Sequence, residues 1–344
     1  MSRTFDLFKL HSPKIDNKPR KWINATGKCI TDEVKRLIED ICQDTQLKIK
    51  DICKIVGKIL DCHWMVIYNR FNGYKWVPLP VLITLLDTWK IFCNKKEVEY
   101  EIKGKYIQSK IEFLKTCGNT SKPVKAVKTI SKNLCKIAGA HAADGTLYFN
   151  QTKNGSYYVI AITDEYKMAI RELALLINRV FGLKIKPRKR KYDNSWQIRF
   201  KNKVIGRYLN IFFEFPIGSK SHIVKEPLII KSSSIRCRKG FLQGVMTFDG
   251  CVNKNNQIEL YLRSKLLVKD IENILNIINL NARYSEIGGF FRLRTRIIKQ
   301  RNLNEWKDIF FGNSEKRWKM INQTFSTCLH KNEPNRVEMV TYNL

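Results

Sequence analysis

Two short segments of matching pattern constrain this chain more than any other feature. Ile137–Gly145 reads Ile-Ala-Gly-Ala-His-Ala-Ala-Asp-Gly, and Leu242–Gly250 reads Leu-Gln-Gly-Val-Met-Thr-Phe-Asp-Gly. Each has a glycine at its third position and ends in Asp-Gly, which places the acids Asp144 and Asp249 in equivalent positions, 105 residues apart. The pattern predicts two short helices that pack side by side, each delivering one carboxylate to the same place.

The third position of each segment is the basis for this packing. Gly139 and Gly244 would let the two helix backbones approach closely, as small residues do at helix–helix interfaces. The acid at each helix end is unfavourable by roughly 0.3–1 kcal/mol, because the C-terminal end of a helix carries partial negative charge. Two such acids predict a compensating cation, and two carboxylates with backbone oxygens and waters suit Mg²⁺.

The sequence after each segment predicts one order of elements used twice. Residues 146–163 predict a hairpin that turns near Gly155, followed by a helix to about Phe181, a second hairpin and a helix over 204–213. The same order follows Gly250, with helices over Leu266–Leu280 and Asn304–Asn322. We predict an α+β fold of two pseudo-symmetric αββαββα repeats, over 131–233 and 234–323, whose sheets form a saddle. The polar residues 324–344 predict a frayed tail.

The first 118 residues predict a separate, small all-α domain. Met1–Gly27 is polar and basic, which predicts an arm with little structure. Short amphipathic helices joined by glycine-bearing turns favour a helix-turn-helix unit, with a plain helical bundle as the alternative. Glu97–Ile107 alternates weakly and predicts a hairpin, and the turn-rich residues 119–130 predict a linker. The candidate recognition helix, within Cys62–Phe71, carries Trp64, Tyr68, Asn69 and Arg70.

The charge of the chain predicts a polyanionic partner. Lys and Arg number 63 against 31 Asp and Glu, a net charge of +32. Nucleic acid is the first candidate, because neutralising phosphates releases counterions; a membrane surface and a merely solvated basic surface are the alternatives. The sequence has neither an N-terminal apolar stretch nor an apolar run of about 18 residues, so we expect a cytoplasmic protein of prokaryotic type with no membrane partner. None of the ten cysteines forms a Cys-x-x-Cys pair, a pattern that fits neither a zinc site nor a compact disulfide framework.

The two segments resemble the motif for which the LAGLIDADG homing endonucleases are named. The resemblance covers about Ser131–Asn322, and two copies match the layout of the family's single-chain members. It implies a monomeric endonuclease that uses two or more Mg²⁺ ions and cuts a long duplex site across the minor groove, leaving four-nucleotide 3′ overhangs. Asp144 and Asp249 would be the metal-binding and catalytic acids. His141 lies mid-helix and is expected to be packed or exposed, not a ligand.

Family members also place basic or polar residues around the metal site. Phe215–Ser221 and Phe311–Lys316 resemble stretches of the archaeal type, which makes Lys220 and Lys316 candidates to polarise the attacking water or the scissile phosphate. In other members a Gln or Lys ends the second strand, a place held by Asp164 in the first copy. Asp164 would stabilise a phosphoryl transition state poorly, and we interpret it as a helix N-cap.

Basic and polar residues recur at alternate positions of the predicted strands. Because alternate side chains of a strand share a face, one face of each sheet would meet DNA, contacting base edges and phosphates in the major groove. The predicted contacts are Lys184, Lys186, Arg188 and Arg190 on one strand, Gln197, Arg199 and Lys201 on the next, Arg263 at the end of another, and Arg292, Arg294 and Arg296 on the last, with Gln257, Glu259 and Tyr261 on a further strand.

These observations predict a site-specific endonuclease of double-stranded DNA. The alternative is a catalytically silent RNA maturase, with intron RNA as partner, or a DNA-binding regulator on the same fold; loss of the motif acids would identify either, and both acids are present. A helical interaction protein predicts no charge clustering on alternate strand positions. An intein would open on Cys or Ser and end in His-Asn, whereas this chain opens at Met1 and ends Val340–Leu344. We therefore expect a free-standing protein of the kind that introns encode.

Overall fold

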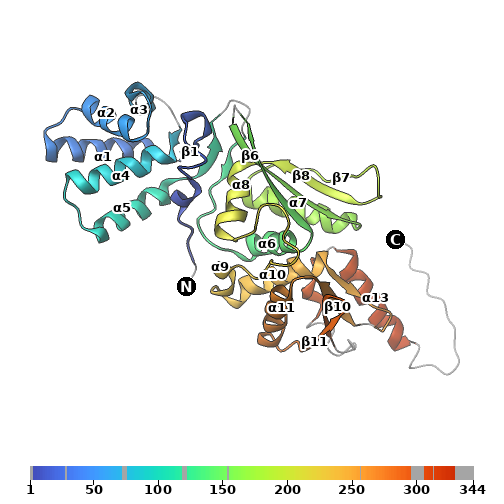
Figure 1. Cartoon of the computed structure of the whole chain (residues 1–344). Helices are drawn as coiled ribbons and strands as arrows, with labels where there is room; N and C mark the ends of the chain where they lie inside the picture. The colour runs from blue at the N-terminus through green and yellow to red at the C-terminus, as the bar shows by residue number, and fades with distance from the viewer. Residues whose placement is uncertain are drawn as a thin grey trace.

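The computed structural model describes residues 3–27, 29–71, 76–117, 122–152, 155–255, 257–295, 306–312 and 314–329. Arg296 and the tail from residue 330 lie outside these ranges, and so does the side chain of Arg70. The described chain is mixed α and β with three antiparallel sheets of four strands each. Figure 1 shows an N-terminal group of helices on one side, two sheets with their helices on the other, and helices α6 and α10 between the two sheets. No helix within the described ranges is long and apolar enough to cross a membrane.

The first of these two sheets follows helix α6. The order is α6 (Lys132–Asp144), β5 (Gly145–Thr152), β6 (Gly155–Asp164), α7 (Lys167–Phe181), β7 (Arg188–Lys189), β8 (Trp196–Lys201), and α8 (Lys203–Arg207) continued by the π-helical turn η3 (Tyr208–Phe212). The Ser131 side chain caps α6 by accepting from the N–H of Leu134, and α7 ends at Gly182, which takes the left-handed conformation common at helix ends. The strands lie in the order β5-β6-β8-β7. Helix α7 packs against β6 and β8. The opposite face, called the open face below, carries the exposed side chains of Arg199 and Lys201 on β8.

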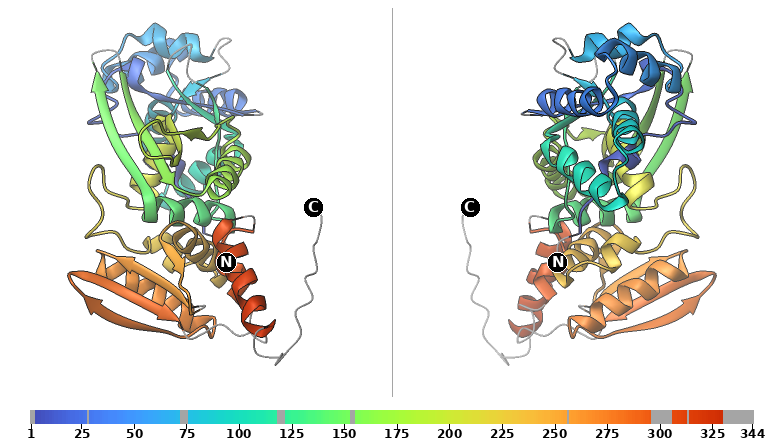
Figure 2. Two further views of the ribbon diagram at one scale, coloured as in Figure 1. Left: turned by 90° about the vertical axis from the view of Figure 1, so that its right-hand side faces the viewer. Right: turned by 90° about the vertical axis from the view of Figure 1, so that its left-hand side faces the viewer.

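The second sheet follows helix α10 and has the same connectivity. The order is α10 (Ile235–Phe248), β9 (Gly250–Val252), β10 (Ile258–Leu262), α11 (Lys265–Ile277), β11 (Ala282–Ile287), β12 (Phe290–Thr295), then the turn η5 (Lys307–Ile309) and α13 (Glu315–Leu329), with α9 (Leu228–Lys231) preceding α10. The strands lie in the order β9-β10-β12-β11, and α11 packs against β10, β11 and β12 (orange in Figure 2). The helix predicted over Asn304–Asn322 corresponds in part to α13, which begins at Glu315 and runs into the residues predicted to fray, whereas Asn304 and Glu305 lie outside the described residues.

Helices α6 and α10 pack backbone to backbone, as the glycine pattern predicts (Figure 1). A Cβ atom at Gly139 would lie 2.1 Å from the carbonyl oxygen of Phe241, and one at Gly244 would lie 2.3 Å from that of Lys136. Real Cβ contacts are never this short. The two glycines are therefore required by space, and they fix where the two helix ends lie relative to each other.

The N-terminal part is not all α, contrary to the prediction. It contains β1 (Ile23–Thr26), α1 (Ile30–Thr45), α2 (Ile49–Ile59), α3 (Trp64–Phe71), β2 (Val77–Pro78), α4 (Leu79–Phe92), α5 (Glu97–Lys110), β3 (Phe113–Thr116) and β4 (Val124–Lys125), with the strands in the order β2-β1-β3-β4. The hairpin predicted over Glu97–Ile107 is helix α5, whose first turn is capped when Glu99 accepts from the N–H of Lys96. Strand β4 lies inside the predicted linker, and Val124 is buried.

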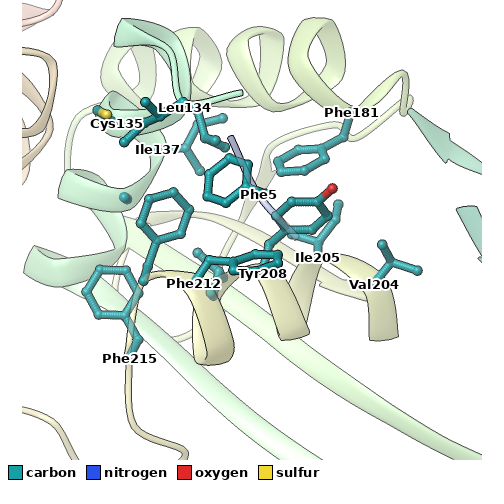
Figure 3. Packing of buried hydrophobic residues seen from close by; sticks show 14 of the residues in the cluster. Phe5, Leu134, Cys135, Ile137, Phe181, Val204, Ile205, Tyr208, Phe212 and Phe215 are labelled. Carbon is teal, nitrogen blue, oxygen red and sulfur yellow. The ribbon is translucent and has the colours of Figure 1, made fainter. Parts of the chain in front are cut away.

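The N-terminal segment is part of the core, so the prediction of a loosely structured arm is wrong. Turns η1 (Leu7–Leu10) and η2 (Pro19–Lys21) order it. The Phe5 ring inserts among the side chains of the first repeat (Figure 3), 4.7 Å from the ring of Phe212 between centroids and edge-on to Tyr208. The segment's few apolar residues are buried because α8 and η3 offer them a complementary surface, which the local sequence does not reveal.

A buried ion-pair cluster completes this attachment. The Asp16 carboxylate accepts hydrogen bonds from the ammonium of Lys203 and from Arg207, and His11 lies 3.3 Å from it. Burial raises the pKa of Asp16, but His11 and the two cations outweigh burial and hold it well below its usual range. Since removing one partner of a buried pair leaves an uncompensated charge, the cluster fixes the N-terminal segment on α8.

Candidate active site

Asp144 and Asp249 lie at the ends of the two packed helices. Asp144 is the last residue of α6, and Asp249 follows α10 directly. Strands β5 and β9 begin at the next residue in each case, Gly145 and Gly250. A Cβ at Gly250 would lie 2.4 Å from the carbonyl oxygen of Met246, and one at Gly145 would lie 2.3 Å from a nitrogen of His141. The Asp-Gly pair is thus the helix-to-strand corner, with glycine required by space, and the acids stand where the two sheets begin.

The two carboxylates share one electrostatic environment. Burial raises the pKa of Asp144, and the negative charge of Asp249 raises it further. Burial also raises the pKa of Asp249. The charge of Asp164 adds to the rise for Asp249. Carboxylates whose ionisation is disfavoured by burial and by a neighbouring acid are typical of sites built for a proton or a cation.

A lysine stands beside each helix end. Lys220 donates hydrogen bonds from its ammonium to the carbonyl oxygens of Ala142 and Ala143, at the end of α6. Lys316 is buried and donates to the carbonyl oxygen of Phe248, at the end of α10, over 2.6 Å. Both lysines lower the pKa of Asp144 and of Asp249. The two lysines singled out in the sequence therefore lie at the acids, where they also neutralise the partial negative charge of the helix ends.

Asp164 is a third acid at this place, which the sequence reasoning interpreted only as a cap. It ends β6, and its Oδ1 accepts from the N–H of Tyr166 just before α7, whereas the N-cap position of that helix is Tyr166 itself. Within the described part of the chain its Oδ2 is buried without a hydrogen-bond partner. Burial raises the pKa of Asp164 to about 7, with Lys316 opposing the rise and Asp144 adding to it. Its place at the end of the second strand was the sequence signal that could have identified Asp164 as part of the site.

His141 is packed, as expected, and faces away from solvent. It is fully buried, and its ring lies 4.9 Å from that of Phe215 between centroids. Burial lowers its pKa to about 3, and the nearby positive charge of Lys220 adds to this. The imidazole is therefore neutral at physiological pH.

The donor set suits a cation that keeps much of its water. Among the described residues, no group of three or more His, Cys, Asp or Glu side chains is close enough together to hold a metal ion. Asp144 and Asp249 form a pair of carboxylates with raised pKa values, and Mg²⁺ is commonly held by one or two carboxylates, with waters and substrate phosphates completing its shell. The residues fit Mg²⁺ held jointly with a phosphate, and they do not form a closed protein site.

Six of the seven residues predicted to contact DNA from the first sheet are exposed. In β8, Arg199 and Lys201 are exposed, whereas Ile198 is buried and Phe200 is half-buried on the other face. Gln197 donates to Thr163 over 2.9 Å on the neighbouring strand. The four residues predicted on the preceding strand, Lys184, Lys186, Arg188 and Arg190, are all exposed, although only Arg188 and Lys189 form β7.

The second sheet has the same alternation but a less open set of cations. Leu293 and Thr295 of β12 are buried, while Arg292 and Arg294 point to the other face. Both arginines form ion pairs with Glu259 on β10. Arg263 is exposed, with its guanidinium 5.3 Å from the centroid of the Phe290 ring. We predicted from the sequence that Glu259 is a further polar contact to DNA. In the structure it forms ion pairs with two of the arginines predicted to contact DNA.

The predicted recognition helix exists as α3, packed on α2. Ile67 is buried, Tyr68 is 36% exposed, and Trp64 is half-buried with the ammonium of Lys50 over its ring. The arrangement is compatible with either a helix-turn-helix unit or a plain bundle.

No protein-family model matches the chain. It is 26% identical over 272 residues to a probable translation initiation factor IF-2 of Methanocaldococcus jannaschii, which covers 75% of this chain and 22% of that protein. It is 23% identical over 154 residues to a DNA polymerase of Thermococcus hydrothermalis, 44% of this chain and 9% of that protein. The chain thus spans about a fifth or less of the length of these curated relatives.

Among solved structures, the homing endonuclease I-DmoI in complex with DNA and Mn aligns at 20% identity and a TM-score of 0.39, over 57% of this chain and 98% of that one. The homing endonuclease I-WcaI, bound to its DNA recognition sequence, aligns at 15% identity and a TM-score of 0.37, over 56% of this chain and 87% of that one. At these identities and TM-scores the likeness does not show what this chain does.

Proposed function

We propose that this protein is a site-specific endonuclease of double-stranded DNA, of the LAGLIDADG type, that acts as a monomer. The observation that carries the proposal is the pair Asp144 and Asp249, held at adjoining helix ends by the contact of Gly139 with Gly244 and flanked by Lys220 and Lys316. Each acid directly precedes the first strand of a sheet, and the open face of the first sheet carries exposed basic residues. The two sheets would form a saddle on the duplex, with the acids at its centre.

Each group at the site has a role in phosphodiester hydrolysis. Bound divalent metal, with Mg²⁺ as the expected ion, would supply Lewis-acid stabilisation of charge on the phosphate and lower the pKa of water. Asp144 and Asp249 would hold that cation against the phosphate of each strand. Lys220 and Lys316 place an ammonium next to each acid, where it stabilises negative charge that grows on the phosphoryl oxygens.

Asp164 changes the first half of the site relative to the family pattern. A carboxylate in place of a Gln or Lys cannot donate to a phosphate when ionised. With its pKa raised to about 7, it is largely protonated at mildly acidic pH and can then donate. We infer that Lys220 supplies the basic partner of this half-site.

A binding protein without cleavage is the second candidate. It is favoured by the fact that the two lysines already compensate the acids and that the described residues hold no three-ligand metal cluster. An RNA maturase that binds intron RNA, or a DNA-binding regulator, would use the same open sheet faces.

A plasmid-cleavage assay separates these candidates. The substrate is a plasmid that carries the intron-free insertion region of the gene's own locus, incubated with Mg²⁺, with Asp144→Asn and Asp249→Asn as controls. We expect linear product from the wild type and none from either variant. Lys220→Met and Lys316→Met should bind the same DNA and cut it at least about 100-fold more slowly, the scale at which a single charge-stabilising group acts. Binding without cutting by the wild type would refute the enzyme, and full double-strand cutting by Asp144→Asn would refute the site.

A further inference from the structure

A basic cavity joins the N-terminal part to the first sheet. Its volume is about 580 Å³, within the range of ordinary ligand sites. One wall comes from β3 and the residues before β4, and includes Lys115 and Lys122; the other comes from β6, β8 and the segment between α7 and β7, and includes Arg199 and Lys201. Two parts of the chain that we predicted from the sequence to be separate domains therefore line one cavity.

The charge of this cavity is of one sign. Eight Lys and Arg residues line it, and its described lining includes neither Asp nor Glu. Lys203 is engaged by Asp16, which leaves seven cations without a carboxylate in the lining. Like charges gathered in a concave site raise the local concentration of an anionic partner. A chain of phosphates fits this charge better than a single small anion.

The walls are fixed in place. The N–H of Cys117, next to β3, donates to the carbonyl oxygen of Trp22 over 3.1 Å, and the Asp16 ion pairs hold the N-terminal segment on α8. The ammonium of Lys201 lies 4.7 Å from the centroid of the Tyr157 ring, and that of Lys115 lies 4.6 Å from the Trp76 centroid. Lys201 and Lys115 are thus positioned before any ligand arrives.

A buried hydroxyl points to a ligand at the same place. Ser156 lines the cavity, is 8% exposed, and its Oγ is buried without a hydrogen-bond partner among the described residues. A hydroxyl left this way is costly, by about 1–3 kcal/mol, unless another group satisfies it. A phosphate oxygen accepts such a donor.

We propose that this cavity binds the phosphodiester backbone of duplex DNA that flanks the half-site read by the first sheet. Arg199 and Lys201 belong both to the open face of β8 and to the cavity lining, so DNA on that face continues toward Lys115 and Lys122. The N-terminal part then lengthens the DNA interface on one side only, through contacts that read no base. This inference rests on the proposed DNA-binding function.

The test compares charge-matched variants of the full chain. Lys115→Ala/Lys122→Ala removes two cations from the cavity, and Lys35→Ala/Lys269→Ala removes two exposed cations from α1 and α11. Binding to a fluorescein-labelled random-sequence duplex is followed by anisotropy as salt rises from about 50 to 200 mM. Each lost phosphate contact lowers the salt slope by about 0.9, so the affinity advantage of the wild type over the cavity variant should shrink about 12-fold across this range. The control should keep the wild-type slope.

The outcomes separate the cavity from the enzyme. Equal salt slopes for the cavity variant and its control would overturn the proposed DNA contact in the cavity, but not the proposed DNA binding by the sheets. Wild type that fails to bind duplex DNA overturns the proposed function, and so does preference for single-stranded RNA. If Lys115→Ala/Lys122→Ala melts below the control, the single exposed-site change Lys122→Glu replaces it and must lower the slope by at least as much as one contact. Hydroxyl-radical footprinting on the insertion region should show protection that extends further on one side, and symmetric protection would contradict the proposal.

Discussion

A methyl group added at Gly139 has no room between the two motif helices. Its Cβ would lie 2.1 Å from the carbonyl oxygen of Phe241 and 3.0 Å from the Cα of Gly244, whereas carbon and oxygen normally approach to about 3.3 Å. Helices α6 and α10 would have to separate by about 1 Å. Overpacking of this kind costs about 1–3 kcal/mol and occasionally more, and the higher helix propensity of alanine offsets about 1 kcal/mol of that.

Gly104→Ala is the matched control. Gly104 is also a buried glycine inside a helix, α5, but its nearest neighbours are the ends of the Leu86 and Phe8 side chains, at 3.2 and 3.8 Å. These can shift, so the propensity gain of about 0.5–1 kcal/mol should prevail. The two variants should differ by about 1–3 kcal/mol in the free energy of unfolding. In a domain of this size that separates their melting temperatures by about 2–10 °C.

Differential scanning calorimetry of both variants measures this difference, and the cleavage assay adds a second readout. We expect Gly139→Ala to melt below the wild type and to cut DNA more slowly, because the helix ends that carry Asp144 and Asp249 move apart. A Gly139→Ala protein that melts with or above Gly104→Ala would refute the close contact of the helices. Loss of cleavage without loss of stability would mean that the acids move while the packing does not.

Three further changes follow from the charges. Asp249→Asn should stabilise the metal-free protein. Because the pKa of Asp249 is raised in the folded state, its ionisation destabilises the fold as pH rises from the unfolded pKa, near 4, through the raised value. Thermal melts should therefore show a gain of about 1–2 kcal/mol at pH 8, after allowance for partial exposure, and no gain at pH 4. Asp16→Ala should cost about 3–5 kcal/mol, because Lys203 and Arg207 keep buried charges without a partner; urea titration checks this, and a loss below about 1 kcal/mol would contradict it. His141→Leu should stabilise by about 1–3 kcal/mol, because both ring nitrogens are buried without partners among the described residues, and chemical denaturation that shows a loss would point to a bound water or ion there.

The sequence predicts the repeated part of this fold well and its attachments poorly. The spacing of small residues and the alternation of polar and apolar residues are local signals. They therefore locate helices α6 and α10, and they show which strand residues share a face. The burial of Phe5 against Tyr208 and the Asp16 pairs depend on contacts across about 200 residues, which no local pattern reports. Helix α5 was missed because Val98 and Ile102 are exposed, which obscures a helical period.

The candidate site divides in the same way. The acids are found from Asp-Gly at equivalent positions, and Lys220 and Lys316 from their surrounding stretches. Lys115 was not predicted as a contact, because the domain boundary that we predicted from composition separates the β3 wall of the basic cavity from the first sheet. It also treats Glu259 as a DNA contact, since the sequence shows its face but not the arginines opposite it.

The two lysines, Lys220 and Lys316, compensate the unfavourable negative charge of the acids at the helix ends when no metal ion is bound. A carboxylate at a helix C-terminus opposes the partial charge there, and here the carbonyl oxygens of Ala143 and Phe248 each accept from an ammonium instead. Burial lowers the pKa of Lys220, and the two acids oppose that change, so acids and lysine stabilise one another's charged forms. The proposed site is therefore assembled without a metal ion. A divalent cation bound there would displace protons from Asp144 and Asp249, so its affinity should rise with pH through the range in which these acids ionise.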